Sequence, residues 1–189
     1  MSNQALQEQF TAIYEARSDS IFRFCLLKVS EREQALDIVQ ETFTRLWQSL
    51  TKGTKVENDR AFLFTVANRL IIDWYRKKKA LSFSSLEDKD TDELFDPPDE
   101  KTANSLSLCA EGRYLISMIS ELSSGNRSAV YLRYVEGLSP RDIGDILGLS
   151  ANVASVRINR GINELKRLTG YDIDSSGAEG DRSEGEQDI

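Results

Sequence analysis

Residues 138–168 constrain the fold of this chain more than any other stretch, because several helix-boundary signals fall close together there. Ser139 and Asp142 have the spacing of a capping box, and the proline between them suits the first position of a helix. Gly148 ends the apolar pattern of this short helix and tolerates the left-handed backbone of a tight turn. Ser150 then offers a new N-cap. The stretch therefore predicts two helices joined by a three-residue turn, which is a helix-turn-helix unit.

The second of these helices has two unlike faces. The inner face is expected to be apolar or small, with Ala154, Ile158, Gly161, Ile162 and Leu165. The outer face carries Asn152, Val153, Val156, Arg160 and Asn163, with Arg157 at its edge. Exposed valines beside arginines suit a DNA groove, which offers phosphates and thymine methyl groups, better than they suit water. We therefore favour DNA binding over the alternative, a helical hairpin with a solvated basic side.

The net charge of −7 is unusual for a protein that binds nucleic acid, but it is unevenly distributed. Residues 1–79 carry 13 basic and 10 acidic side chains, and residues 113–170 carry 8 basic and 5 acidic ones. The negative charge comes from two segments. Residues 80–112 carry 2 basic and 9 acidic side chains, and residues 171–189 carry 1 basic and 7 acidic side chains. Both expected folded parts are therefore mildly basic, and the acidic segments predict a linker and a tail.

Composition excludes several classes of site. The sequence contains no histidine, so histidine-based catalytic triads and the common zinc sites are excluded. Cys25 and Cys109 lie among apolar residues in different segments, which favours reduced thiols over a disulfide or a metal site. No apolar run reaches the roughly 20 residues of a transmembrane helix, and residues 1–8 lack the apolar core of a signal peptide. We expect a cytoplasmic protein with two small domains and no cofactor or metal.

The first third of the chain is expected to be helical. Apolar residues predict one amphipathic helix beginning near Phe10 and a second one at residues 21–27, which is apolar nearly all round. A third helix would begin at a capping box formed by Ser30 and Glu33 and end near Thr51.

The outer face of the third helix carries polar side chains, including two carboxylates four residues apart. Its members are Asp37, Glu41, Thr44 and Gln48, with Gln40 and Arg45 at the edges. Such a face leaves three interpretations open: a solvated surface, a partner-binding surface or, less favoured, a metal site.

Residues 51–58 predict a loop, and a long helix is expected from Asp59 to Lys79. Its buried face would consist of Phe62, Leu63, Val66, Ala67, Leu70 and Trp74. Another face would carry Thr65, Asn68, Arg69, Ile72 and Arg76. Residues 76–79 are four consecutive cations, which exceeds the charge that a helix C-terminus favours. Cations beside aromatic side chains, here Trp74 and Tyr75, indicate binding of phosphates and unstacked bases.

Three motifs, taken in this order and spacing, resemble bacterial sigma factors of the extracytoplasmic-function (ECF) group. They are DIVQETFTRLW at residues 37–47, FLFTVANRLIID at residues 62–73 and LRYVEGLS at residues 132–139. The resemblance implies an all-α protein with two small helical domains, the second of which contains the helix-turn-helix. The expected segments are a region 2-like domain (1–80), a flexible acidic linker (81–104), a region 4-like domain (105–170) and a disordered acidic tail (171–189).

The resemblance further implies a promoter-recognition subunit of RNA polymerase, and not an enzyme. Contacts to the clamp helices of core RNA polymerase would come from Asp37, Gln40, Glu41 and Arg45. Contacts to the downstream, minus-ten element and its melted strand would come from Lys55, Asn58, Asn68, Arg69, Ile72, Arg76 and Lys77. Contacts to the upstream, minus-thirty-five element would come from Asn152, Val153, Val156, Arg157 and Arg160. The polymerase flap and an anti-sigma factor are the further implied partners.

Two other functional classes stay open on the sequence alone. One is a stand-alone helix-turn-helix regulator that does not need core polymerase and whose N-terminal helices only dimerise. The other, disfavoured because no further ligands cluster with them, is a metal-dependent enzyme using Asp37 and Glu41. The acidic tail has two interpretations of its own: a solvated end, or a segment that competes with DNA for basic surfaces.

Overall fold

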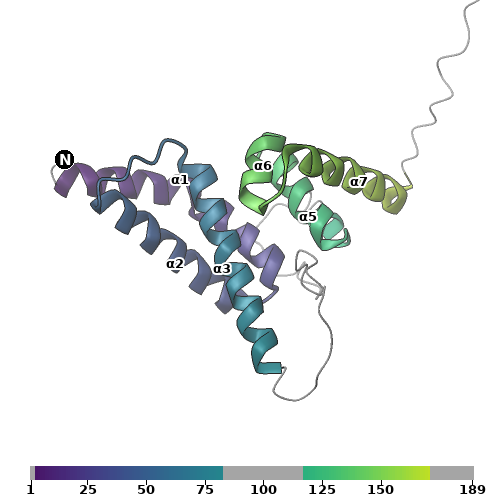
Figure 1. Ribbon diagram of the computed structural model, residues 1–189, viewed down its shortest axis with the longest axis horizontal. Coiled ribbons are helices and arrows are strands. Elements are labelled where there is room, and N and C mark those ends of the chain that lie inside the picture. Colours follow the sequence, from purple (N-terminus) through teal and green to yellow (C-terminus); the bar gives the residue numbers. More distant parts are fainter. Residues whose placement is uncertain (1–2, 83–116, 171–189) are drawn as a thin grey trace, which may run out of the picture.

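The computed structural model describes residues 3–82 and 117–170, and every regular element in these two ranges is a helix (Figure 1). The order is α1 (Asn3–Val29), α2 (Arg32–Thr51), α3 (Asp59–Ser82), α5 (Ser124–Val130), η2 (Tyr131–Val135), α6 (Pro140–Leu147) and α7 (Ala151–Thr169). The all-α fold class expected from the sequence is confirmed. The expected linker lies outside the described residues except for the end of α3, and the tail and Cys109 lie wholly outside them.

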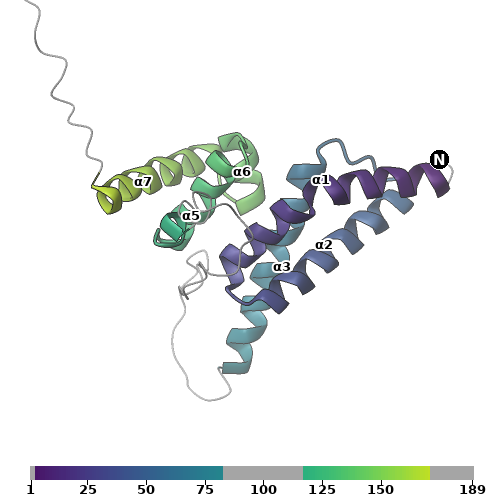
Figure 2. The same cartoon turned by 180° about the vertical axis from the view of Figure 1, so that it is seen from behind.

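The N-terminal group of helices consists of α1, α2 and α3. In both views α1 and α2 lie side by side and α3 crosses them (Figures 1 and 2). Aromatic rings pack between the first half of α1 and the second half of α2. The ring centroids of Phe10 and Trp47 are 5.4 Å apart, and those of Tyr14 and Phe43 are 4.8 Å apart. The second half of α1, apolar on nearly every side, is the centre of this group because both α2 and α3 pack on it.

Two sequence predictions for this group were wrong. The two helices expected before Ser30 are one continuous helix, since residues 14–20 contain neither glycine nor proline to interrupt it. Ser30 does not cap α2: its φ is +62°, a left-handed conformation that reverses the chain between α1 and α2. The N-cap is Glu31, whose backbone is extended and whose side chain makes no capping bond. The tight reversal between two packed helices therefore overrides the local capping signal.

The C-terminal group consists of α5, η2, α6 and α7. A glycine allows the closest approach in it, because a Cβ built on Gly161 of α7 would lie 2.4 Å from Cγ2 of Val130 on α5. The Glu164 carboxylate accepts hydrogen bonds from the Ser123 backbone N–H (3.1 Å) and from Asn126 Nδ2 (3.0 Å). A side chain of α7 thus caps the N-terminus of α5, which fixes the two helices to each other. The helix expected over residues 105–122 is described only from Ser117.

The π-helical turn η2 decides which side chains enter the core between α5 and α6. The backbone N–H of Glu136 donates to the carbonyl of Tyr131 (3.2 Å), five residues earlier, and Tyr131 and Leu132 are fully buried. Val135, three residues after Leu132, is 44% exposed. The wider turn changes the register that a plain α-helical period predicts.

The two groups share one hydrophobic core. The ring of Phe24 on α1 packs edge-on against Phe64 of α3 at 5.2 Å and lies 6.1 Å from the ring of Tyr131 in η2. All three rings are fully buried, so each group covers apolar surface of the other. Burial of a ring of this size stabilises the folded chain by about 2–3 kcal/mol relative to exposure.

Candidate nucleic-acid interface

The helix-turn-helix boundaries lie where the sequence places them. Ser139 Oγ accepts a hydrogen bond from the Asp142 backbone N–H (3.2 Å), and Asp142 Oδ2 accepts one from the Ser139 N–H (3.3 Å), which completes the capping box. Gly148 is left-handed, with φ +71°. Ser150 Oγ accepts from the Val153 N–H (3.3 Å) at the start of α7. Both helices of the unit are thus bounded by short-range hydrogen bonds.

Gly144 is a second requirement of the turn, and no sequence pattern predicted it. A Cβ at this position would lie 2.7 Å from the carbonyl oxygen of Leu149, which belongs to the turn itself. The backbone of the turn therefore lies directly on α6, and only glycine allows this approach.

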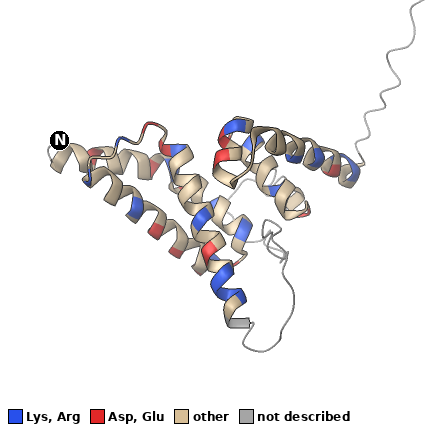
Figure 3. Ribbon diagram, viewed as in Figure 1, with Lys and Arg blue, Asp and Glu red and all other residues tan. Residues whose placement is uncertain are grey.

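The outward face of α7 is open to solvent among the described residues. Val153 is 42% and Val156 46% exposed, Asn152 and Arg160 are exposed, and Arg157 is half-buried at the edge of this face. Positions held by Lys or Arg recur along α7 from Arg157 to its end (Figure 3). All five predicted contact residues of the upstream element therefore lie together on one helix, with apolar and cationic groups interleaved.

The corresponding face of α3 is not wholly open. Arg69, Arg76 and Lys77 are exposed and Ile72 is half-buried. Asn68 is only 4% exposed, and its Nδ2 donates a hydrogen bond to the carbonyl oxygen of Ile146 in α6 (3.0 Å). The prediction that Asn68 lies on a solvent-facing side of the helix was therefore wrong, because the C-terminal group covers that position.

The two predicted DNA contacts in the loop before α3 have partners within their own segment. Asn58 Oδ1 accepts a hydrogen bond from the Ala61 backbone N–H (2.9 Å), so this side chain caps α3. Lys55 and Glu57 form an exposed ion pair (3.2 Å). Such an exposed pair stabilises the fold by well under about 1 kcal/mol, so Lys55 can readily leave Glu57 and pair with another anion.

The aromatic residues near the end of α3 have different environments. Tyr75 was expected to offer a stacking surface, but it is buried, and its hydroxyl donates to the backbone carbonyl of Lys28 (2.6 Å). Trp74 was expected to be buried, but it is half-buried, and Lys78 Nζ lies 4.8 Å from its ring centroid. Trp74 and the exposed cations after it are thus the groups that a strand of DNA can reach.

The outer side of α2 forms a ridge between two grooves. Asp37, Gln40 and Glu41 are exposed on it, and Glu41 Oε1 pairs with Arg45 Nε at 2.9 Å. On the α1 side lies a largely apolar groove of about 560 Å³, lined by Phe10, Tyr14, Leu36, Val39, Gln40, Phe43, Thr44 and Trp47. On the α3 side lies a second groove of about 420 Å³, whose lining has more charged residues: Gln34, Asp37, Ile38, Glu41, Arg45, Leu70, Asp73, Trp74, Arg76 and Lys77. The second groove brings predicted polymerase contacts and predicted DNA contacts to one surface.

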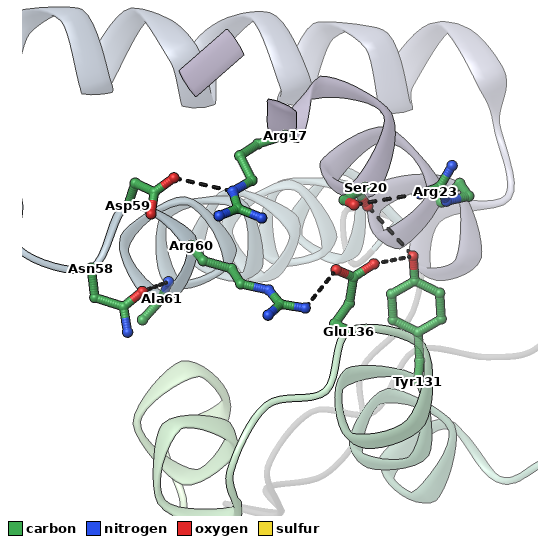
Figure 4. Close-up of polar contacts among 9 residues, drawn as sticks. All are labelled: Arg17, Ser20, Arg23, Asn58, Asp59, Arg60, Ala61, Tyr131 and Glu136. Carbon is green, nitrogen blue, oxygen red and sulfur yellow. Dashed lines mark hydrogen bonds and ion pairs between the residues drawn. The ribbon is translucent and has the colours of Figure 1, made fainter. Parts of the chain in front are cut away.

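A polar cluster that the sequence did not predict lies between the two groups (Figure 4). Arg60 of α3 forms an ion pair with Glu136 (3.3 Å), and the hydroxyl of Tyr131 donates to the same carboxylate (3.1 Å). Burial, together with the negative charge of Glu136, raises the pKa of Tyr131 well above its usual range, so its hydroxyl stays protonated. No local pattern marks this cluster, because Arg60 and Glu136 are 76 residues apart.

No group of three or more metal-ligating Cys, Asp or Glu side chains occurs within residues 3–82 and 117–170. Burial raises the pKa of the free Cys25 thiol well above its usual range, which makes it an unreactive core residue. None of the helices in those ranges is long and apolar enough to cross a bilayer.

Both halves of the chain match protein families of known type. Residues 13–81 match Sigma-70 region 2, which spans most of α1, all of α2 and nearly all of α3. Residues 112–165 match Sigma-70, region 4, which contains the helix-turn-helix. The chain therefore belongs to the sigma-70 family, as a sigma factor of the two-region ECF kind.

The full-length relatives agree with this assignment. The ECF RNA polymerase sigma factor SigL of Mycobacterium tuberculosis is 27% identical over 159 residues, which cover 84% of this chain and 86% of the relative. The ECF RNA polymerase sigma factor SigX of Bacillus subtilis is 22% identical over 167 residues, 86% and 84% of the two chains.

Two solved structures show the same fold. The sigma factor RpoE from Bartonella quintana, solved with the anti-sigma factor NepR, has a TM-score of 0.64 at 20% identity, covering 87% of this chain and 99% of that one. CnrH, solved with the cytosolic domain of CnrY, has a TM-score of 0.55 at 20% identity, covering 90% and 91%.

Proposed function

We propose that this chain is an ECF sigma factor that binds core RNA polymerase, directs initiation at specific promoters and helps to melt them. The observation that carries the proposal is that sigma-70 regions 2 and 4 occur together, at residues 13–81 and 112–165. We assign polymerase docking and downstream recognition to residues 1–80, upstream recognition to 105–170, a linker role to 81–104 and a tail to 171–189.

Upstream recognition is assigned to the outward face of α7. Arg157, at the edge of this face, is placed to contact phosphate, whereas Arg160 is exposed further along it and has the fork geometry for a guanine base edge. Val153 and Val156 offer only apolar groups, and the thymine methyl is the apolar group that the major groove presents. Asn152, in the first turn, completes the set.

Downstream recognition and melting are assigned to α3 and the loop before it. Unstacking a base costs a few kcal/mol, and a basic surface with an aromatic ring offsets that cost through phosphate contacts and stacking. The accessible groups of this kind are Lys55, Arg69, Ile72, Trp74, Arg76 and Lys77. Asn58 and Asn68 belong to the same surface by resemblance, although both amides have partners within the chain.

Polymerase docking is assigned to the ridge of α2. Asp37, Gln40 and Glu41 point away from the apolar stripe of this helix and are exposed, so a partner helix can contact them without unfolding. Arg45 continues the ridge, held by Glu41. The clamp helices of core polymerase are the partner that family membership supplies, and the flap is the corresponding partner of the C-terminal group.

Regulation by an anti-sigma factor is part of the proposal. One solved structure with this fold, that of the sigma factor RpoE from Bartonella quintana, is a complex with the anti-sigma factor NepR. We infer that the chain acts by binding, not by catalysis, and that it acts in the cytoplasm, where polymerase and chromosome meet.

The deciding experiment combines the purified chain with core polymerase on DNA fragments that the reconstituted enzyme selects from a random library. Specific initiation in the presence of the chain, and none without it, is the expected result. DNA binding that is unaffected by polymerase would instead indicate a stand-alone regulator.

Docking is tested by Asp37→Ala combined with Gln40→Ala. Removal of two exposed contacts should weaken core-polymerase affinity about tenfold to a hundredfold, measured by fluorescence anisotropy, with an unchanged melting temperature. The control is Asp19→Ala, which removes an exposed carboxylate from α1. Affinity equal to the control would refute the docking assignment.

A further inference from the structure

Glu164 is a natural ion-pair partner for an arginine of the upstream-reading face, but it does not form that pair. It follows Arg160 by four residues on α7. Side chains with this spacing are neighbours on the surface of a helix, and opposite charges so placed attract each other. Arg160 is nevertheless exposed, and it forms no ion pair with any residue that the structure describes. The carboxylate is held elsewhere.

Three donors at the start of α5 hold the Glu164 carboxylate. Its Oε1 accepts a hydrogen bond from the Ser123 backbone N–H at 3.1 Å. Its Oε2 accepts one from Asn126 Nδ2 at 3.0 Å and one from the Ser123 hydroxyl at 3.3 Å. Burial raises the pKa of Glu164, but these bonds and the charge of Arg167 together leave it below its usual value, so the group is ionised at neutral pH. Both oxygens of a charged carboxylate are thus directed toward α5.

Close packing keeps the carboxylate within reach of these donors. Gly161, one turn before Glu164, lies so near α5 that an added Cβ would be 2.4 Å from Cγ2 of Val130 and 3.3 Å from Cβ of Asn126. Rotation of α7 about its axis would break this contact. The rotation that places Glu164 on α5 is therefore also the one that leaves Arg160 facing outward.

We propose that Glu164 is a positioning residue for upstream recognition, because the donors of α5 keep its carboxylate away from Arg160 and leave that guanidinium free for DNA. A carboxylate released from α5 would pair with Arg160 and would also repel the phosphates of a bound duplex. Arg157 would be spared, since it lies two turns before Glu164, roughly 10 Å along the helix axis. The role of Arg160 in reading DNA rests on the proposed function, whereas the placement of the carboxylate does not.

Release of the carboxylate is tested first without DNA. Asn126→Ala removes one donor, and Ser123→Pro removes the other two at a position whose φ of −52° suits proline. In the full chain with both changes, the Nε–H signal of Arg160 in proton–nitrogen correlation spectra should shift, because the guanidinium gains a partner. Adding Glu164→Gln should return the signal to its wild-type position, since a neutral amide forms no ion pair. An Arg160 signal that none of these changes moves would overturn the proposal.

The consequence for DNA is measured on upstream duplexes taken from fragments that the wild-type chain selects with core polymerase. Arg160→Ala identifies the base position that Arg160 reads. The chain with Asn126→Ala and Ser123→Pro should bind the preferred duplex about fivefold more weakly and lose preference at that same position. Adding Glu164→Gln should restore the affinity to within about twofold of wild type. Adding Asp145→Asn instead, which removes an exposed carboxylate from α6, is the matched control and should not restore it.

A role of Glu164 in stability alone predicts the opposite sign, because Glu164→Gln would then add to the loss of binding. A further loss with Glu164→Gln, or equal restoration by Asp145→Asn, would overturn the proposal. If the Arg160 signal moves and returns while Arg160→Ala changes no base preference, the proposed reading role fails and the placement of the carboxylate stands. Circular dichroism melting identifies losses caused by unfolding. Asn126→Ala alone, which keeps both donors of Ser123, should show weaker forms of the same effects, again reversed by Glu164→Gln.

Discussion

The outward face of α7 is open to solvent, whereas the corresponding face of α3 is partly covered by α6. The face of α7 is presented by a unit whose boundaries are held by short-range bonds at Ser139, Gly148 and Ser150. The face of α3 is shaped by contacts with residues more than 70 positions away, at Glu136 and Ile146. One DNA-binding surface is therefore a property of its own segment, and the other depends on how the two groups pack.

The largest expected effect is on the free energy of unfolding, and it comes from removing a side chain of the hydrophobic core that the two groups share. Phe24→Ala deletes a fully buried ring that packs against both Phe64 and Tyr131, and it should lower the free energy of unfolding by about 3–5 kcal/mol. Chemical denaturation followed by circular dichroism measures this loss. Tyr14→Ala removes a ring that is 45% exposed and should lose less than half as much. Equal losses would mean that the shared core is not what stabilises the chain.

The second comparison lies within α3. Trp74→Ala should lower the free energy of unfolding by about 2 kcal/mol and also impair promoter opening, because the half-buried ring packs on Tyr75 and faces solvent as well. Arg76→Ala removes an exposed cation whose pairing with Asp73 is long, at 3.9 Å, and should impair DNA engagement alone. If both variants have the same melting temperature, the role of α3 in stabilising the fold cannot be separated from its role in engaging DNA.

The third comparison separates positioning from reading on α7. Arg160→Ala should relax preference at one base position by about 1–3 kcal/mol. Val156→Ala should weaken binding by about 1 kcal/mol on the preferred upstream element, and little where the contacted thymine is replaced by uracil. Arg157→Ala should weaken binding on all sequences and reduce the salt slope by about one. Titrations on matched duplexes over a salt series measure all three, and identical losses on every duplex would show that α7 reads no bases.

Much of the fold followed from short-range patterns. The capping box at Ser139, the left-handed Gly148 and the outward valines of α7 were predictable, because each depends on residues within one or two turns. Ser30 was mispredicted, because its local capping signal is overridden by the reversal between two packed helices.

The site on α3 could be predicted only in part. The exposed cations follow from composition and helical period, but the burial of Asn68 does not, since its partner is the Ile146 carbonyl, 78 residues on. Tyr131 is similar: an aromatic residue in a helical run has no local feature that selects it for the junction of two groups. Contacts of this kind depend on the tertiary arrangement, and a helical period gives at best the side of the helix that forms them.

The smallest expected effect is on the stability of the fold, and it concerns Glu164, whose hydrogen bonds fix α7 to α5. Burial raises the pKa of Glu164, but hydrogen bonds from Asn126 and Ser123 outweigh it and leave the pKa of this carboxyl below its usual value. A carboxyl whose folded-state pKa is lowered stabilises the fold at pH values above its unfolded-state pKa, and this contribution disappears as the pH falls through the folded-state pKa. Glu164→Gln keeps an acceptor oxygen but removes the charge, so it should destabilise the chain at pH 7 by roughly 0.5 kcal/mol or less.

The difference between Glu164→Gln and wild type should shrink as the pH is lowered from 7 to below about 4, since both side chains are then neutral. Denaturation midpoints measured over this range provide the test, and Glu15→Gln, at an exposed position on α1, provides the control for loss of a carboxylate charge. The same variants should leave single-strand binding by α3 unchanged, because the hydrogen bonds of Glu164 join α7 to the start of α5 alone. A constant difference at every pH would show that Glu164 acts through packing and not through its charge. In that case burial would hold α7 in position, as it does α3.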